Sequence, residues 1–335
     1  MSAREPRLHR VAGFALDSGR VLDEVVQAYH LDGELNRERD NLVVVFHALT
    51  GSADAAEGWW REVVGPGLTL DTGRYAVLCA NLLGSCYGTV GPWQRTGEPP
   101  PPITPRDQAR LIGLLVEELG VRSVALATGG SLGGMVALEW AALFPERTRA
   151  VVVLAAPAAH TAQAIGWNHV QRRAIEIAGV EGLALARMAA MLTYRTADEF
   201  EARFGREEDG EGRFQVQRYL EHHGERLLAR FDVPSYLALT GAMDAHDVGR
   251  GRGGVRAALA PFRGKLVGVG IPGDLLYTDA DVRRWTDETG AEYREIRSVH
   301  GHDAFLIESG QVSTILSGVL NEVSPARAGE EKGTG

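Results

Sequence analysis

The chain has 335 residues, of which 44 % are hydrophobic and 24 % are charged, and it contains only two cysteines. The hydrophobic fraction excludes a disordered or collagen-like chain, and two cysteines exclude a disulfide scaffold. A formal net charge of −9 argues against a general nucleic-acid binder. The apolar runs are far shorter than the roughly 20 residues of a membrane span, and the first ten residues lack the apolar stretch of a signal peptide. We therefore expect a soluble, cytoplasmic protein.

Four short valine-rich segments in the first half of the chain have the composition of strands that are covered on both faces. Two apolar segments with helical spacing alternate with them. The expected strands are 41–46, 75–80, 123–127 and 150–155, and the expected helices are 105–119 and 133–144. This alternation is typical of an open α/β sheet with crossover connections.

The pattern changes near residue 160, where the sequence becomes rich in alanine and arginine and mostly follows a helical period, as in 181–194. After a glycine-rich loop, the α/β pattern resumes, with expected strands at 265–271 and 291–296 and a helix at 279–289. We therefore predict a helical insertion in an α/β core. The predicted parts are a first core segment 1–158, a helical cap 159–250, a second core segment 251–323 and a disordered tail 324–335.

The segment Gly129–Gly133 matches the pattern GxSxG, with Ser131 at its centre. It follows an expected strand directly and opens an expected helix, which is the setting of a nucleophile elbow. Such a tight turn needs small neighbours, and glycines supply the room. The N–H groups at the start of the helix favour developing negative charge. The context therefore favours Ser131 as a nucleophile over a serine that merely caps a glycine-rich turn.

A serine hydroxyl is a weak nucleophile until a base takes its proton, and in this kind of fold the acid and the base follow the serine in that order. His302 lies in a polar turn after the last expected strand, and His300 is its competitor two residues earlier. Asp274 follows the strand 265–271 at its carboxyl end, where ligands of open sheets gather. Asp279 and Asp281 are alternatives, but both stand at the start of the next helix, where a capping aspartate is ordinary.

An oxyanion hole needs two N–H donors. We expect one from Leu132, directly after the nucleophile, and the other from Leu49 or Thr50, in the turn after strand 41–46. We expect no metal ion at this site, because Cys79 and Cys86 are too far apart for a CxxC motif.

With their flanks, these motifs resemble the homoserine O-acetyltransferase family of the α/β-hydrolase fold. The similarity extends from about residue 41 to 310 and includes segments that are not general features of that fold. The similar segments are HALTG (47–51), GWWREVVGPG (58–67), 71–81, LGSCYGTVGP (83–92), 129–140, 163–175, RFDVPSY (230–236), 246–254 and HGHDAFL (300–306). The resemblance implies an α/β-hydrolase core with an inserted helical cap.

The resemblance also implies roles for single residues. Ser131, Asp274 and His302 correspond to the family's triad, because its base stands directly before Asp-Ala-Phe-Leu. Asp303 corresponds to the residue that holds the amino group of the acceptor amino acid. Arg187 and Tyr194 match an arginine that binds the acceptor carboxylate and a tyrosine of the same site. A guanidinium can bind a carboxylate through two hydrogen bonds, which agrees with this assignment.

The resulting hypothesis is a two-step transfer of an acetyl group from acetyl-CoA, through Ser131, to the hydroxyl of L-homoserine in methionine biosynthesis. The alternatives are a homoserine O-succinyltransferase, a serine O-acetyltransferase and a carboxylesterase-type hydrolase with the same triad. We expect no tightly bound cofactor, and the family implies a homodimer that forms through the cap helices. Because CoA is polyanionic, Arg250, Arg252 and Arg256 are candidates for its entrance, the alternative being a solvated loop.

Overall fold

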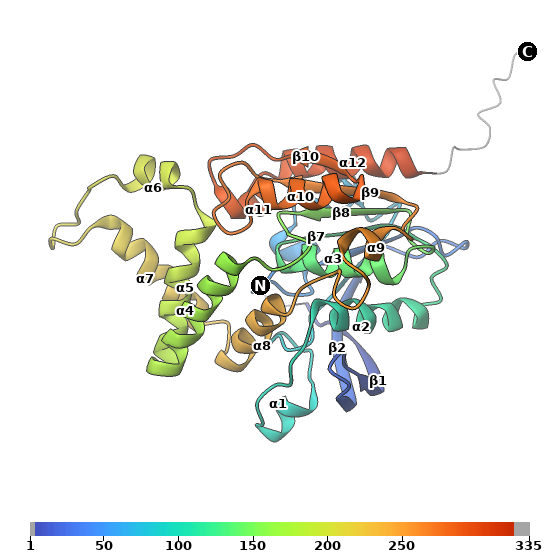
Figure 1. The fold of residues 1–335 in the computed structure, drawn as a ribbon, viewed down its shortest axis with the longest axis horizontal. Coiled ribbons are helices and arrows are strands. Elements are labelled where there is room, and N and C mark those ends of the chain that lie inside the picture. Colours follow the sequence, from blue (N-terminus) through green and yellow to red (C-terminus); the bar gives the residue numbers. More distant parts are fainter. Residues whose placement is uncertain (1–3, 325–335) are drawn as a thin grey trace, which may run out of the picture.

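The computed structural model describes residues 4–324. An eight-stranded sheet forms the centre of the molecule in the order β1-β2-β6-β3-β7-β8-β9-β10, with helices on both faces (Figure 1). From β6 to β10 all neighbouring strands pair in parallel, as the alternation of strands and helices predicted. The strands are β1 Arg7–Ala15, β2 Val21–Asp32, β3 Leu42–Phe46, β6 Ala76–Ala80, β7 Val124–Gly130, β8 Ala150–Leu154, β9 Lys265–Gly270 and β10 Glu292–Glu295. A separate pair consists of β4 Val64–Gly65 and β5 Leu70–Asp71.

Side chains of the central strands alternate between two buried apolar layers. In β3, Leu42, Val44 and Phe46 belong to the same apolar layer as α2, α3 and α10, whereas Val43 and Val45 belong to the layer of α12. Burial on both faces explains why these strands are continuous apolar runs in the sequence. The core helices are α1 Pro92–Thr96, α2 Pro105–Glu118, α3 Leu132–Leu143, α9 Val255–Leu259, α10 Asp279–Thr289, α11 Ala304–Ile307 and α12 Ser309–Val323.

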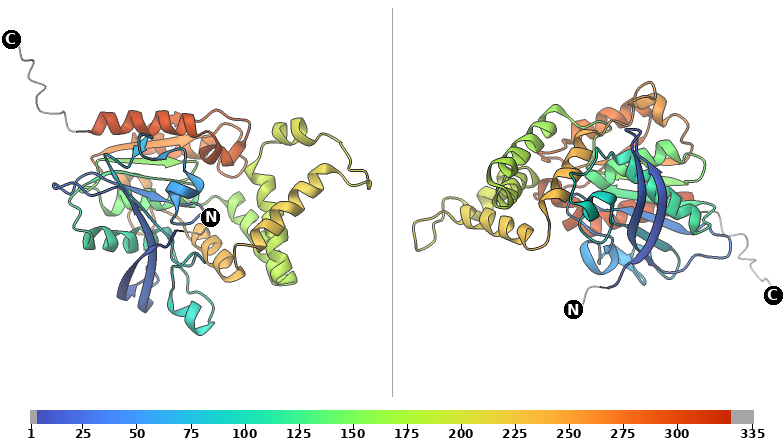
Figure 2. Two further views of the ribbon diagram at one scale, coloured as in Figure 1. Left: turned by 180° about the vertical axis from the view of Figure 1, so that it is seen from behind. Right: turned by 90° about the horizontal axis from the view of Figure 1, so that it is seen from below.

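Each strand and helix that the sequence predicted by its bounds is present, with ends within three residues of those expected. The hairpin of β1 and β2 was not predicted. Its two strands are antiparallel to each other, and β2 is also antiparallel to β6. The hairpin curves along one edge of the sheet (Figure 2). In β2, Gln27 and His30 are buried among apolar residues. These polar residues interrupt the apolar run by which the other strands were recognised.

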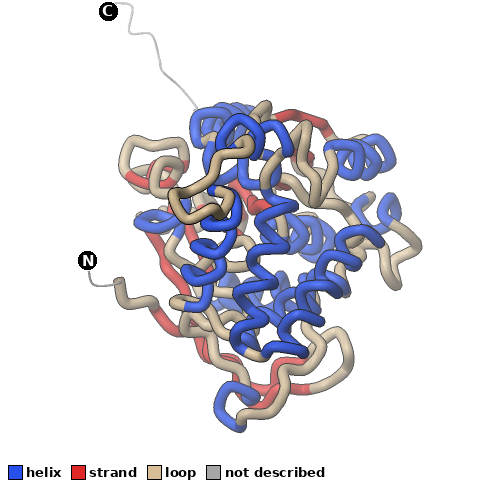
Figure 3. The backbone as a smooth tube through the Cα atoms, turned by 90° about the vertical axis from the view of Figure 1, so that its left-hand side faces the viewer, coloured by secondary structure: helices blue, strands red, loops and turns tan. Residues whose placement is uncertain are grey.

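Between β8 and α9, five helices extend away from the sheet, and several of them are in front in Figure 3. They are α4 Ala162–Ala178, α5 Val180–Tyr194, α6 Ala197–Phe204, α7 Gln215–Leu228 and α8 Val233–Asp244. The chain leaves and re-enters the core at one place, because Ala159 bridges to Asp247 and the Val248 N–H donates to the Ala158 carbonyl. We call 159–250 the cap, and its division from the core as a domain stays a prediction. Of the predicted tail, all but Ser324 lies outside the described residues.

Within residues 4–324, we find no helix of the length and apolarity that crossing a membrane requires.

Candidate active site

Ser131 stands at a sharp turn between β7 and α3. Its φ of 58° lies in the left-handed region that non-glycine residues rarely adopt. The neighbouring glycines allow this turn to press against the end of β3, since a Cβ at Gly133 would lie 2.1 Å from the Phe46 carbonyl oxygen and one at Gly129 would lie 2.6 Å from it. The Ser131 side chain makes no capping hydrogen bond to α3. Its hydroxyl is therefore not used to hold the helix.

His302 and Asp274 form a buried pair at the carboxyl ends of the last strands. Nδ1 of His302 lies 2.6 Å from Oδ2 of Asp274, while Oδ1 accepts the N–H groups of Leu276 and Tyr277 at 2.8 and 3.0 Å. Burial acts to lower the pKa of His302, but the charge and hydrogen bond of Asp274, with a smaller effect from Asp303, raise it above the usual value of 6.5. Nε2 of His302 has no hydrogen-bond partner among residues 4–324. This nitrogen is available to a hydroxyl.

The alternatives that the sequence left open have other partners. Nδ1 of His300 lies 3.1 Å from a carboxylate oxygen of Glu199, not near Asp274. Asp281 accepts hydrogen bonds from Thr278 in a capping box at the start of α10. The geometry therefore favours His302 as the base and Asp274 as its acid partner.

The two predicted oxyanion donors lie on the loops that flank Ser131. Leu132 is the first residue of α3, so its N–H has no partner within the helix. Leu49 lies in the loop after β3 and lines the same cavity as Ser131. In the described part of the chain, neither N–H donates a hydrogen bond to another group. Both are therefore free to bind an oxyanion.

The residues predicted to hold an amino acid come together with the triad. Arg187 lies over the ring of Tyr194, 5.2 Å from its centroid, and the Tyr194 ring centroid is 5.6 Å from that of His302. Asp303 forms an ion pair with Arg195 at 3.2 Å. Burial raises the pKa of Asp303, although the charges of Arg195 and Arg187 oppose this shift. A cation and a carboxylate are thus available beside the base.

These side chains surround a cavity of about 480 Å³. The residues that line it are Ala48, Leu49, Thr50, Gly51, Ser52, Gly58, Trp59, Tyr87, Ser131, Arg187, Tyr194, Arg230, His302, Asp303, Phe305 and Leu306. Core loops contribute the serine, the histidine and the carboxylate, whereas the cap contributes Arg187, Tyr194 and Arg230. A substrate in the cavity would therefore lie between the core and the cap.

Comparison with known proteins gives the family. A model of the α/β-hydrolase fold matches residues 41–199. A homoserine O-acetyltransferase of Thermus thermophilus is 47 % identical over 93 % of this chain and 90 % of its own length. The chain belongs to the homoserine O-acetyltransferase family. A crystal structure of a homoserine O-acetyltransferase from Staphylococcus aureus is 30 % identical and covers 94 % of this chain and 95 % of its own, with a TM-score of 0.82. The acetyl esterase MekB, at 22 % identity and a TM-score of 0.82 over 95 % of this chain and 97 % of its own, shares the fold.

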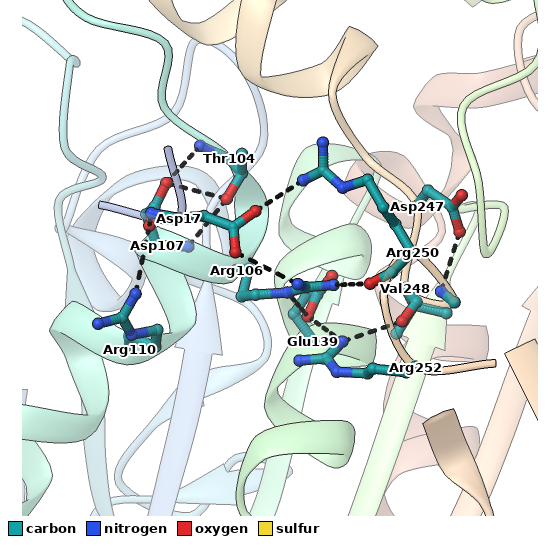
Figure 4. Close-up of polar contacts among 11 residues, drawn as sticks. Asp17, Thr104, Arg106, Asp107, Arg110, Glu139, Asp247, Val248, Arg250 and Arg252 are labelled. Carbon is teal, nitrogen blue, oxygen red and sulfur yellow. Dashed lines mark hydrogen bonds and ion pairs between the residues drawn. The ribbon is translucent and has the colours of Figure 1, made fainter. Parts of the chain in front are cut away.

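The family assignment confirms the predicted α/β-hydrolase fold, but the structure does not bring Arg250 and Arg252 to the cavity. Arg252 donates to Glu139 at 2.6 Å, and Arg106 donates to the same carboxylate oxygen at 3.2 Å (Figure 4). Arg250 donates to Asp17 at 2.8 Å. The two arginines that were predicted to contact CoA thus bind carboxylates of the core. We call Arg106, Arg250, Arg252, Glu139 and Asp17 the Glu139 cluster.

Arg256 does not line the cavity either, so none of the three arginines expected at a CoA entrance contributes to the cavity wall of this homoserine O-acetyltransferase homologue. Among the cavity residues for which the sequence gave no role are three large side chains with polar groups. Trp59, Tyr87 and Arg230 lie in the family-like segments 58–67, 83–92 and 230–236. Similarity of these segments to the family was the signal that marked them. Arg195, which pairs with Asp303, had no such signal.

Proposed function

We propose that this chain transfers an acetyl group from acetyl-CoA to the hydroxyl of L-homoserine through an acetyl-Ser131 intermediate. The observation that carries the proposal is one cavity that contains a serine, a His302–Asp274 pair and two opposite charges, Arg187 and Asp303. The relatives that match most of the chain are homoserine O-acetyltransferases. A zwitterionic acceptor requires both charges, whereas hydrolysis of a simple ester requires neither.

In the first step, Oγ of Ser131 attacks the thioester carbonyl carbon while Nε2 of His302 takes the hydroxyl proton. The hydrogen bond from Nδ1–H to Asp274 fixes the tautomer that leaves Nε2 able to accept it. The N–H groups of Leu49 and Leu132 hold the negative charge that develops on the carbonyl oxygen. The carbon–sulfur bond then breaks, and CoA leaves with the proton that His302 returns to its sulfur.

In the second step, homoserine binds with its carboxylate on Arg187 and its ammonium group near Asp303. His302 takes the proton of the homoserine hydroxyl, and that oxygen attacks the acetyl carbonyl carbon. The bond to Ser131 breaks and its Oγ regains a proton from His302, which yields O-acetylhomoserine. Since Asp303 already pairs with Arg195, the ammonium becomes a second cation beside a buried carboxylate. Its presence favours the ionised form of Asp303.

The direct test is release of CoA from acetyl-CoA in the absence of acceptor. We expect a burst of one CoA per active site, followed by slow turnover that homoserine accelerates. A steady-state matrix of acetyl-, propionyl- and succinyl-CoA against homoserine and serine then identifies the donor and the acceptor. Preference for succinyl-CoA or for serine would assign one of the related transferases. Steady acetyl-CoA hydrolysis that homoserine does not accelerate would instead support an esterase.

We further propose that the protein acts in the cytoplasm, in methionine biosynthesis, as a homodimer joined through α4 and α5. These two helices carry large apolar side chains that are exposed, and the side chain of Ile177 is the most exposed at 76 %. The others are Ile165, Val170, Val180, Leu185 and Leu192. Several exposed apolar side chains on two helices that pack together support an interface there. Sedimentation should give a dimer for the native chain and a monomer for Ile177→Asp.

A further inference from the structure

Arg230 connects the cap to two core loops at the edge of the cavity. It lies between α7 and α8, and its Nη1 donates to the Thr50 carbonyl and to the Tyr87 hydroxyl, both at 2.8 Å. Its Nη2 donates to the Thr50 hydroxyl at 3.2 Å. All three residues line the cavity of Ser131. One cap side chain therefore fixes two loops of the core.

The loop that Arg230 holds is the one that supplies an oxyanion donor. On its inner side, Nε2 of His47 accepts the Leu82 N–H at 2.9 Å, and Nδ1 lies 2.8 Å from the Ala48 carbonyl oxygen. Burial lowers the pKa of His47 to about 4, so a neutral ring donates from one nitrogen and accepts at the other. This inner side of the loop is thus fixed by the core itself.

The outer side of the loop depends on the cap. In the described part of the chain, the Thr50 carbonyl and hydroxyl accept hydrogen bonds from Arg230 alone. Arg230 forms no ion pair with any carboxylate of residues 4–324 within 4.0 Å. Its charge is therefore directed at the loop, and the fork of its guanidinium suits two oxygens of one residue.

We infer that Arg230 is a positioning residue, which holds Thr50 by its carbonyl and hydroxyl so that the N–H of the preceding residue, Leu49, faces the oxyanion. Because Arg230 belongs to the cap, the oxyanion hole is complete only when the cap is seated on the core. The inference rests on the proposed function, since it assumes acyl transfer through Ser131. It assigns to Arg230 a role in the chemical step rather than in binding homoserine. Arg187, whose charge acts on Asp303, serves the acceptor instead.

The test compares two acyl donors, the polyanionic acetyl-CoA and the neutral ester p-nitrophenyl acetate. Loss of one N–H group of an oxyanion hole lowers kcat by about 10²- to 10³-fold, and displacement of that N–H group should cause part of this decrease in kcat. We therefore expect Arg230→Met to lower kcat by about 10- to 100-fold with both donors, with KM for homoserine unchanged. Arg230→Lys should recover part of the loss, because an ammonium can donate to the Thr50 carbonyl but has no fork.

Arg226→Met is the matched control, because Arg226 is exposed on α7 and does not line the cavity. A higher KM for acetyl-CoA with an unchanged rate on the neutral ester would overturn the inference, since Arg230 would then bind the CoA phosphates. A lower Tm with unchanged kcat would overturn it too. If Arg230→Met does not fold, Tyr87→Phe and Thr50→Val each remove one contact and should lower kcat with both donors. A native enzyme that cleaves the ester but does not acetylate homoserine would refute the proposed function alone.

Discussion

Arginines occupy two very different environments in this molecule. In the Glu139 cluster, Arg106 and Arg252 bind one buried carboxylate, so that the charges of α2, α3 and the loop after the cap compensate one another. In the cavity, Arg187 and Arg230 have no carboxylate within ion-pair distance among the described residues. Burial raises the pKa of Glu139, and the two guanidinium groups oppose that shift. The contrast shows that partners, not residue type, decide whether the charge of an arginine is compensated within the fold or remains without a carboxylate beside the cavity.

The largest expected effect separates chemistry from folding. Ser131→Ala removes the proposed nucleophile from the cavity, and we expect kcat to fall by at least about 10³-fold. Because the Ser131 side chain caps no helix, the Tm should stay within about one degree of the native value. Steady-state acetyl transfer and a thermal melt of the same preparation provide the measurements. Native-like activity in this variant would contradict the assignment of the nucleophile.

The next effect concerns the Glu139 cluster, where a substitution should lower stability and leave kcat unchanged. Glu139→Gln leaves Arg106 and Arg252 beside a buried neutral amide, and breaking a buried ion pair costs about 3 kcal/mol. We expect that loss in the free energy of unfolding, measured with urea, while kcat per folded molecule stays unchanged. In a double-mutant cycle, Arg252→Met should cost less in the Glu139→Gln background than in the native one. Equal costs in both backgrounds would show that the pair is not coupled.

The sequence predicted the parts of the site that depend on local pattern. Ser131 stands in a strand–turn–helix motif, and Asp274 follows a strand end, so short segments were enough to find them. Pairings between distant segments were not predictable in this way. Arg252 meets Glu139 across 113 residues of sequence, and no periodicity indicates which carboxylate a loop arginine will reach. For this reason the sequence did not indicate that Arg250 and Arg252 pair with carboxylates of the core.

A third prediction concerns the arginines of the cavity. Arg187→Met removes the proposed partner of the homoserine carboxylate, and loss of a charge-assisted pair should raise KM for homoserine by about 10- to 100-fold. The rate with p-nitrophenyl acetate in the absence of acceptor should not change. Arg252→Met, from the Glu139 cluster, is the matched control and should leave KM for homoserine at its native value. An increased KM in both variants would remove the distinction between the two arginine environments.

The smallest effect is a displacement of the pH profile. His302, the proposed base, can accept a proton only when it is neutral, and its raised pKa keeps it protonated to a higher pH than an ordinary histidine. Ester turnover, expressed as kcat/KM, should therefore be lost as the pH falls through a midpoint above 6.5.

Asp303 is one of the charges that raise the pKa of His302. Asp303→Asn should therefore lower this pKa and move the acid limb of kcat/KM to lower pH. Use of the neutral ester as substrate keeps the loss of homoserine binding out of the measurement. Glu139→Gln removes a carboxylate that is not among the charges acting on His302, so its acid limb should coincide with that of the native enzyme. A limb displaced equally by both substitutions would mean that net charge, and not the position of a carboxylate beside the base, controls the titration.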